Sequence, residues 1–260
     1  MSKMNIQAFI ERIAREAGAI TMKYYNSPSL RIETKSNDTP VTQADKQAEE
    51  YLRSEIKKHF PNDSIIGEEF GDVNGTADVR WILDPIDGTK TFIRGVPFYG
   101  TLIAREEGDT VTHGCVYLPA LNELLYAERQ KGCWWNGARC HASSIDEVDK
   151  ISLVTTDHKR LEKCLGRDTI SNLIEVVSLY RTWGDCYGHV LVATGRADLM
   201  LDAKCAVWDI APFAVIMDEA GAHYESFSGE RTIRGGDLIT CNAALAPRLP
   251  SLLAPVALPF

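Results

Sequence analysis

The stretch WILDPIDGTKTF, residues 81–92, runs from apolar residues directly into two aspartates three positions apart. Asp84 and Asp87 enclose a Pro-Ile pair, and Gly88 and Thr89 follow at once. Two carboxylates held close together raise each other's pKa unless a positive charge lies between them. A buried strand that ends in this way therefore suggests a bound cation, and the rest of the chain must supply the remaining ligands.

The composition is that of a soluble globular protein. The chain has 260 residues, 45% of them apolar and 25% charged, which suits one large domain or two closely joined ones. A net charge of −8 and the lack of a Lys/Arg run argue against a nucleic-acid partner. No apolar run approaches the ~20 residues that cross a bilayer, so no membrane partner is expected. Seven cysteines without a CxxC pair indicate free thiols in a reducing, cytoplasmic setting.

Apolar periodicity divides the chain at about Ser144. In the first half, residues 6–24 and 42–61 repeat apolar side chains at three and four positions, which predicts two amphipathic helices. Residues 99–140 carry strand-like runs separated by turns, including an Asn-Gly pair, which predicts an antiparallel sheet. We therefore expect residues 1–144 to form an α+β half that holds most of the candidate ligands.

The second half, residues 145–260, alternates strands and helices, which predicts an α/β arrangement. The runs ISLVTT, EVVSLY, ADLMLD and DLITCN are typical of strands. Helices are expected at 159–165, 185–194 and 208–220. Gly195 and Gly221 lie where the last two of these helices should end. No linker separates the halves, so we expect them to pack tightly.

Four carboxylates stand at the ends of apolar runs, namely Glu68, Asp84, Asp87 and Asp209. Each alone has an ordinary explanation: a solvated loop for Glu68, a turn for Asp84, and a charge at a helix N-terminus for Asp209. Together they suit Mg²⁺, which prefers oxygen ligands, and four convergent carboxylates could hold two such ions. A pair of ions a few ångströms apart is a known device for phosphoryl transfer.

The segments GEE, WILDPIDGTKTF and, later, WDIAPFAVIMDEAG resemble the signatures of the magnesium-dependent, lithium-sensitive inositol monophosphatase family. The resemblance extends over nearly the whole chain, through KGCWWNG and LVATGRAD to ITCN. One departure is Ala222, where the family often has a second glycine after EAG. The resemblance implies a layered α-β-α-β-α sandwich, two or three Mg²⁺ ions, inhibition by lithium, and a homodimer.

The resemblance also implies roles for individual residues. Glu68, Asp84 and the carbonyl of Ile86 would bind a first metal ion, and Asp84, Asp87 and Asp209 a second. Glu68, Thr89 and Asp45 would be catalytic, with Thr89 helping to deprotonate a water molecule and Asp45 as its acidic partner. Asp45 also stands three positions after Thr42, which is a capping box in its own right. Gly88 and Thr89 would bind the phosphate, since their N–H groups open a short helix.

The substrate is expected to be a small phosphate monoester, and RTWGDCYG resembles the histidinol-phosphate phosphatase branch of the family. Asp185 and Asp202 would pair with the ammonium or imidazole of L-histidinol phosphate, because charge-assisted hydrogen bonds are strong. Arg181 and Trp183 would line the pocket. Asp185 could instead cap the helix that begins near Cys186.

Two alternatives stay open. The substrate could be inositol 1-phosphate or another sugar or nucleotide phosphate. The chain could also be an inactive phosphate-ligand binding protein on the same fold. The second alternative is disfavoured because every expected metal ligand is present. The DxxD spacing argues against an aspartyl-phosphate enzyme, which would need DxD.

Overall fold

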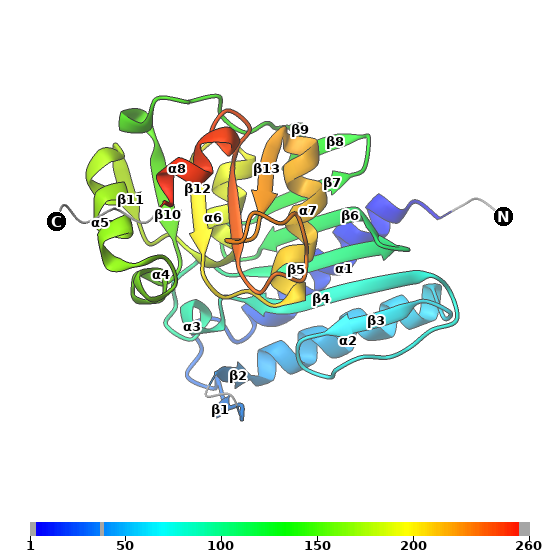
Figure 1. Ribbon diagram of the computed structural model, residues 1–260. Coiled ribbons are helices and arrows are strands. Elements are labelled where there is room, and N and C mark those ends of the chain that lie inside the picture. Colours follow the sequence, from blue (N-terminus) through cyan, green and yellow to red (C-terminus); the bar gives the residue numbers. More distant parts are fainter. Residues whose placement is uncertain (1–3, 37–38, 255–260) are drawn as a thin grey trace.

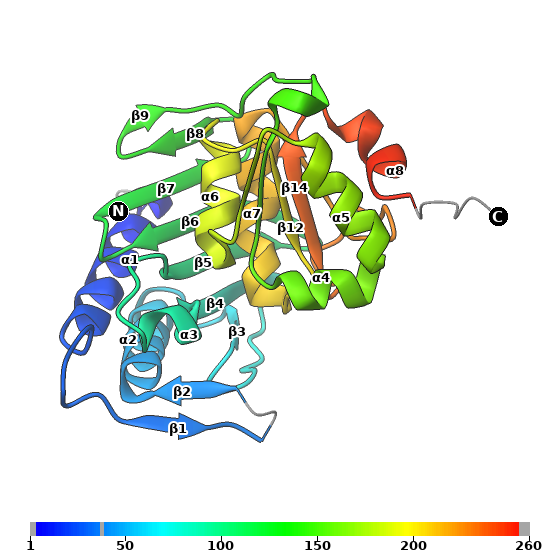
Figure 2. The same ribbon diagram turned by 90° about the vertical axis from the view of Figure 1, so that its left-hand side faces the viewer.

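The computed structural model describes residues 4–36 and 39–254, and its elements stack as helix, sheet, helix, sheet and helix (Figure 1). The three helical layers are α1 (Ile6–Met22) with α2 (Gln43–His59), α6 (Asp185–Ala193) with α7 (Val207–Ala220), and α4 (His158–Leu165) with α5 (Arg167–Val176). Figure 2 shows the first pair and the last pair on opposite sides, with α6 and α7 between the sheets. The predicted α-β-α-β-α sandwich is confirmed.

The first sheet has seven strands within the described residues, and they are paired in chain order. They are β3 (Ser64–Gly67), β4 (Val79–Asp87), β5 (Gly100–Glu107), β6 (Thr110–Leu118), β7 (Glu123–Glu128), β8 (Gly132–Trp135) and β9 (Ala138–Arg139). All neighbours after β4 are antiparallel, as predicted. Successive side chains of a strand point to opposite faces. Accordingly, Trp81 and Leu83 pack with α1 and α2, while Ile82 packs with α7.

The second sheet is mixed, with the order β11-β10-β12-β14-β13 in the described part of the chain. Its strands are β10 (Ser152–Thr155), β11 (Leu179–Arg181), β12 (Leu199–Asp202), β13 (Ala222–Glu225) and β14 (Leu238–Asn242). Val154 and Met200 share a buried cluster with α6 and α7, whereas Leu153 and Leu199 pack with α4 and α5. Because both sheets pack on α7, that helix is apolar around most of its circumference.

The structure differs from the expectation at several short elements. The run EVVSLY (residues 175–180) is not one strand: α5 continues to Val176 and β11 begins at Leu179. A six-residue apolar run has no periodicity that could locate such a boundary. The structure also has elements that were not predicted, namely α5, β1 (Ile32–Thr34), β2 (Pro40–Thr42), β13, α8 (Leu249–Leu252) and the 3₁₀ turns Val148–Lys150 and Ala246–Arg248.

Other local expectations are confirmed. Thr42 and Asp45 form the capping box of α2. Asn136 and Gly137 both have positive φ between β8 and β9, as a tight hairpin turn requires. All seven cysteines carry free thiols. No helix in residues 4–36 or 39–254 is long and apolar enough to cross a membrane.

Candidate active site

An irregularity in β4 brings Asp84 and Asp87 together. Residues three apart in a regular strand point to opposite faces, but the pairing of β4 with β5 shifts register between these two aspartates. The carbonyl of Pro85 inside the shift accepts a hydrogen bond from Thr101 Oγ1 at 2.9 Å, and Ile86 N donates to Asp84 Oδ1 at 3.0 Å. Both carboxylates therefore reach the same point at the end of the strand.

Asp209 completes this cluster from the other half of the chain. One carboxylate oxygen from each of Asp84, Asp87 and Asp209 lies within 4.8 Å of the others. Asp209 stands in the first turn of α7, and its Oδ2 accepts a hydrogen bond from Ala206 N at 2.7 Å. It therefore satisfies a free N–H of the helix start as well as facing the two aspartates of β4.

Glu68 reaches the same cleft from the loop after β3, but it lies outside the three-carboxylate cluster. Lys35 Nζ contacts Glu68 Oε1 at 2.8 Å and Glu69 Oε1 at 2.7 Å. The side chain of Lys35 is only 20% exposed, so this contact is partly shielded from solvent. The sequence analysis did not single out Lys35, because nothing in its own segment shows that it faces two glutamates 33 and 34 positions away.

Thr89 links the cluster to Asp45. The Thr89 hydroxyl lies 3.3 Å from Asp45 Oδ1 and 3.1 Å from the carbonyl oxygen of Ile86. Thr42 donates to the other Asp45 oxygen through its N–H at 2.8 Å and its hydroxyl at 2.6 Å. Burial raises the pKa of Asp45 to about 6 even though these hydrogen bonds favour the charged form. Asp45 thus holds Thr89 in place and could exchange a proton with it.

The electrostatics of the cluster favour a cation. Burial raises the pKa of Asp84 and Asp87 well above the usual range, and neighbouring carboxylates raise both further. Burial also raises the pKa of Asp209, to about 6. No lysine or arginine of the described residues forms an ion pair with these three aspartates. Carboxylate oxygens crowded in this way suit a hard divalent cation, whose charge would stabilise their ionised forms.

The cleft around the cluster has a volume of about 310 Å³ and is lined by both halves. Asp185 and Asp202 face it together with Thr156. The Thr156 hydroxyl donates to Asp202 Oδ2 at 2.6 Å and accepts from Asp185 N at 2.9 Å, so it joins the two aspartates. Burial raises the pKa of Asp202 to about 7. Two further acidic groups therefore share the cleft with the carboxylate cluster.

Asp185 does not cap α6 with its side chain. Gly184 is the N-cap, and Asp185 Oδ2 instead accepts a hydrogen bond from Thr91 Oγ1 at 2.7 Å. Asp185 has a φ of 51°, an uncommon value for a residue with a side chain. Gly88, with a φ of 83°, lies so near that an added Cβ would stand 2.9 Å from Asp185 Oδ2. Position 88 therefore favours glycine both because of its positive φ and because a Cβ would crowd Asp185.

Arg181 and Trp183 are not among the residues that line this cleft. Arg181 is exposed and donates to the carbonyl of Tyr180 at 2.7 Å, and Trp183 is 38% exposed. Three cationic residues that the sequence analysis missed do line it, namely Lys90, Arg160 and Lys204. Lys90 could have been found as the neighbour of Thr89, but the positions of Arg160 and Lys204 depend on how the halves pack.

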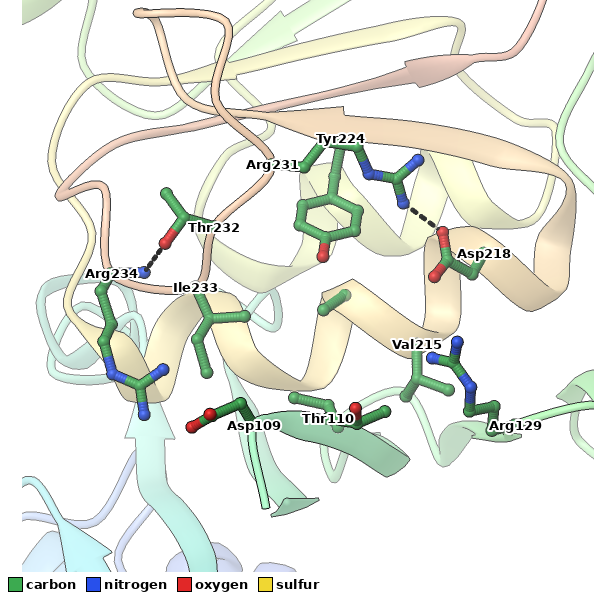
Figure 3. A pocket seen from close by; sticks show the side chains of 12 residues that line it. Asp109, Thr110, Arg129, Val215, Asp218, Tyr224, Arg231, Thr232, Ile233 and Arg234 are labelled. Atoms are coloured by element: carbon green, nitrogen blue, oxygen red, sulfur yellow. Dashed lines mark hydrogen bonds and ion pairs between the residues drawn. The ribbon is translucent and has the colours of Figure 1, made fainter. Parts of the chain in front are cut away.

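A second pocket, of about 220 Å³, lies beside the C-terminal half of α7 (Figure 3). Arg231 and Asp218 form an ion pair on its wall, and Arg234 contacts Glu106 at 3.3 Å. The Arg231 guanidinium also lies 4.6 Å from the centroid of the Tyr224 ring. None of the four candidate ligands lines this pocket, and the described residues of its walls include no cluster of carboxylates. The candidate active site is therefore the cleft at the end of β4.

A carboxylate cluster in a cleft lined by both halves of an α-β-α-β-α sandwich is the arrangement that the family resemblance leads us to expect of a phosphoric monoester hydrolase. The chain belongs to the inositol monophosphatase family, whose model matches residues 3–256. It is 40% identical to a histidinol-phosphatase of Chlorobaculum parvum over 91% of this chain and 92% of the relative. It is 35% identical to an inositol monophosphatase of Mesembryanthemum crystallinum over 80% of each. The solved Thermotoga maritima IMPase superposes with a TM-score of 0.86 at 28% identity, covering 96% of this chain and 97% of that one.

Proposed function

We propose that the protein hydrolyses L-histidinol phosphate to L-histidinol and phosphate. The observation that carries this proposal is the pair Asp185 and Asp202, two partly buried acidic groups in the same cleft as the carboxylate cluster. An amino alcohol phosphate brings one cationic and one anionic end to the site. The cationic end would give these two aspartates a directly bound positive partner, which an uncharged polyol such as inositol cannot supply. The similarity to a histidinol-phosphatase supports the same choice.

The metal is proposed to be Mg²⁺, with two or three ions at the site. Glu68, Asp84, the carbonyl of Ile86, Asp87 and Asp209 would hold them. Bound Mg²⁺ supplies positive charge for the phosphate oxygens and lowers the pKa of water. The same family resemblance leads us to propose inhibition by lithium, which phosphate release in the presence of LiCl would test.

The chain's own residues would manage the proton and the phosphate. Thr89 Oγ1 would take a proton from the attacking water while its own proton passes to Asp45, 3.3 Å away. The pKa of about 6 makes Asp45 a suitable acceptor near neutral pH. Gly88 would let the backbone approach the phosphate at the start of α3 (Thr89–Phe92). Water attacks phosphorus directly in this scheme, and no covalent phosphoenzyme forms.

Release of inorganic phosphate from a panel of esters tests the proposal. With Mg²⁺ present, kcat/KM for histidinol phosphate should exceed that for inositol 1-phosphate, fructose 1,6-bisphosphate and phosphoadenosine phosphate by at least about tenfold, since one charged pair contributes roughly 1.5–3 kcal/mol. A preference for inositol 1-phosphate would support the alternative that the plant relative suggests. Lack of release from every ester would favour an inactive binding protein.

We also propose that two copies of the chain associate and that the protein acts in the cytoplasm. Phe98 and Tyr187 stack with ring centroids 4.3 Å apart, which joins the segment before β5 to the start of α6. These two segments expose Val96 (37%) and Trp183 (38%), apolar side chains that a second copy would cover. Light scattering should then give twice the mass of one chain, whereas a single-chain mass would contradict the dimer. Cell fractionation tests the location.

A further inference from the structure

A buried ion pair on α2 lies directly beneath the loop that carries Glu68. Glu49 is fully buried and Arg53 is 8% exposed, and Arg53 Nε donates to Glu49 Oε1 at 2.7 Å. The two residues are one helical turn apart, so they share the face of α2 that packs toward the first sheet. A buried ion pair is costly to desolvate unless further hydrogen bonds satisfy both groups. Here those further partners are all backbone atoms of one loop.

The pair holds three successive residues after Glu68. Glu49 Oε2 accepts from Glu69 N at 2.8 Å, and Glu49 Oε1 lies 3.3 Å from Phe70 N. The Arg53 guanidinium donates to the carbonyl of Gly71. The backbone N–H of Glu68 itself makes only a long hydrogen bond, 3.3 Å, to Leu83. The ion pair therefore holds the backbone of residues 69–71, while Lys35 contacts the side chains of Glu68 and Glu69.

Gly67 shows how closely the pair approaches the loop. A Cβ added at Gly67 would stand 2.2 Å from Glu49 Oε1 and 2.5 Å from an Arg53 terminal nitrogen. No real Cβ tolerates such distances, so a side chain at this position would displace the ion pair. The glycine of the GEE segment is thus required by the ion pair, since it leaves the space in which the carboxylate reaches the backbone.

We propose that Glu49 and Arg53 are positioning residues that fix the loop 67–71 and thereby set the affinity of the site for its divalent cation. The inference rests on the proposed function in one respect, the role of Glu68 as a metal ligand. Glu49 does not line the cleft and is not itself proposed as a ligand. Glu49 would act through the loop. If the loop were mobile, Glu68 would spend less time in the position that binds the cation, and cation binding would also have to order the loop.

The test measures Mg²⁺ binding by calorimetry on the full chain, together with the melting temperature and the Mg²⁺ dependence of phosphate release. Glu49→Gln should weaken Mg²⁺ binding about 10- to 100-fold, the usual cost of losing a group that orients a metal ligand. At saturating Mg²⁺, kcat should stay within about threefold of the wild type, because the reacting groups are intact. Glu55→Gln is the matched control. Glu55 lies on the same helix as Glu49 and forms ion pairs with Arg12 and Lys58, but it makes no hydrogen bond to the loop 67–71.

A purely structural ion pair gives a different pattern. Glu49→Gln would then lower the melting temperature and leave the Mg²⁺ Kd unchanged where the protein is folded, which would overturn the inference. If Glu49→Gln does not fold, the Mg²⁺ Kd of Arg53→Lys is the deciding measurement. Lysine keeps the positive charge, but its shorter side chain cannot make the same hydrogen bond to the carbonyl of Gly71. An unchanged Mg²⁺ Kd in that variant would also overturn it.

Glu68→Gln, measured in parallel, distinguishes the role of Glu68 as a metal ligand from the role of Glu49 and Arg53 as positioning residues. If Glu68→Gln binds Mg²⁺ like the wild type, the proposed ligand set is wrong. If Glu68→Gln loses affinity while Glu49→Gln and Arg53→Lys do not, the ligand set stands and only the positioning role fails.

Discussion

Asp84→Asn should lower kcat/KM for any phosphate ester by about 10³-fold or more, a loss of roughly 4 kcal/mol of transition-state stabilisation. Asp84 is the candidate ligand shared by both proposed metal positions, and its oxygens lie within 4.8 Å of those of Asp87 and Asp209. Asparagine offers one neutral acceptor oxygen and turns an amide N–H₂ toward the site. It therefore removes the charge that would hold two dications side by side.

The same substitution should leave the fold intact. In the metal-free protein, burial raises the pKa of Asp84 well above its usual range, so its protonated form is favoured. Asparagine has nearly the shape of a protonated aspartic acid, and Ile86 N could still donate to its oxygen. The melting temperature without metal should thus stay close to that of the wild type.

Phosphate release and Mg²⁺ calorimetry on Asp84→Asn check both parts. Asp109→Asn serves as the control, because the Asp109 side chain is 98% exposed and lies away from the cleft. Full activity of Asp84→Asn at millimolar Mg²⁺ would contradict a site that holds two ions through this residue. Equal losses in Asp84→Asn and Asp109→Asn would point to damage unrelated to metal binding.

Local sequence patterns indicated the helices and strands of each half and the two aspartates at the end of β4, and the family resemblance supplied the layered arrangement. Asp84 and Asp87 stand three positions apart in the sequence, and the apolar run before them already indicates a buried strand. What the pattern could not show is the register shift in β4, which depends on pairing with β5. Without that shift the two side chains would point to opposite faces of the sheet.

Contacts between distant segments account for the rest. Lys35 and Glu49 both meet the loop after β3 only because α2 and the β1–β2 hairpin pack beside it. Arg181 was expected in the substrate pocket because it belongs to the RTWGDCYG segment. Its side chain instead donates to the carbonyl of Tyr180 and does not line the cleft. A short motif indicates which residues are candidates for a site. The direction of each side chain depends on strand register and on where a helix begins, and both depend on contacts between distant segments.

Substrate choice should depend on Asp185 and Asp202, and their replacement by asparagine is the second change with a large expected effect. Each substitution removes a charge and keeps a similar shape. Losing one partner of a buried, hydrogen-bonded charge pair typically costs on the order of 2–5 kcal/mol, or ~30- to several-thousand-fold. The loss should fall on kcat/KM for histidinol phosphate at whichever aspartate binds the ammonium. Activity on p-nitrophenyl phosphate, which has no amine, should be nearly unchanged.

The geometry makes the two aspartates unequal. Asp185 Oδ2 already accepts a hydrogen bond from Thr91, and the following residue, Cys186, donates its N–H to Asp87 in the carboxylate cluster. Asp202 receives the Thr156 hydroxyl, and burial raises its pKa to about 7, so a nearby ammonium would stabilise its ionised form most. We therefore expect the larger loss of histidinol phosphate selectivity in Asp202→Asn.

Asp84→Asn, by contrast, should lose activity on histidinol phosphate and on p-nitrophenyl phosphate together. If both aspartate variants keep the wild-type ratio of the two activities, neither carboxylate recognises an amine, and an inositol or sugar phosphate becomes the better assignment.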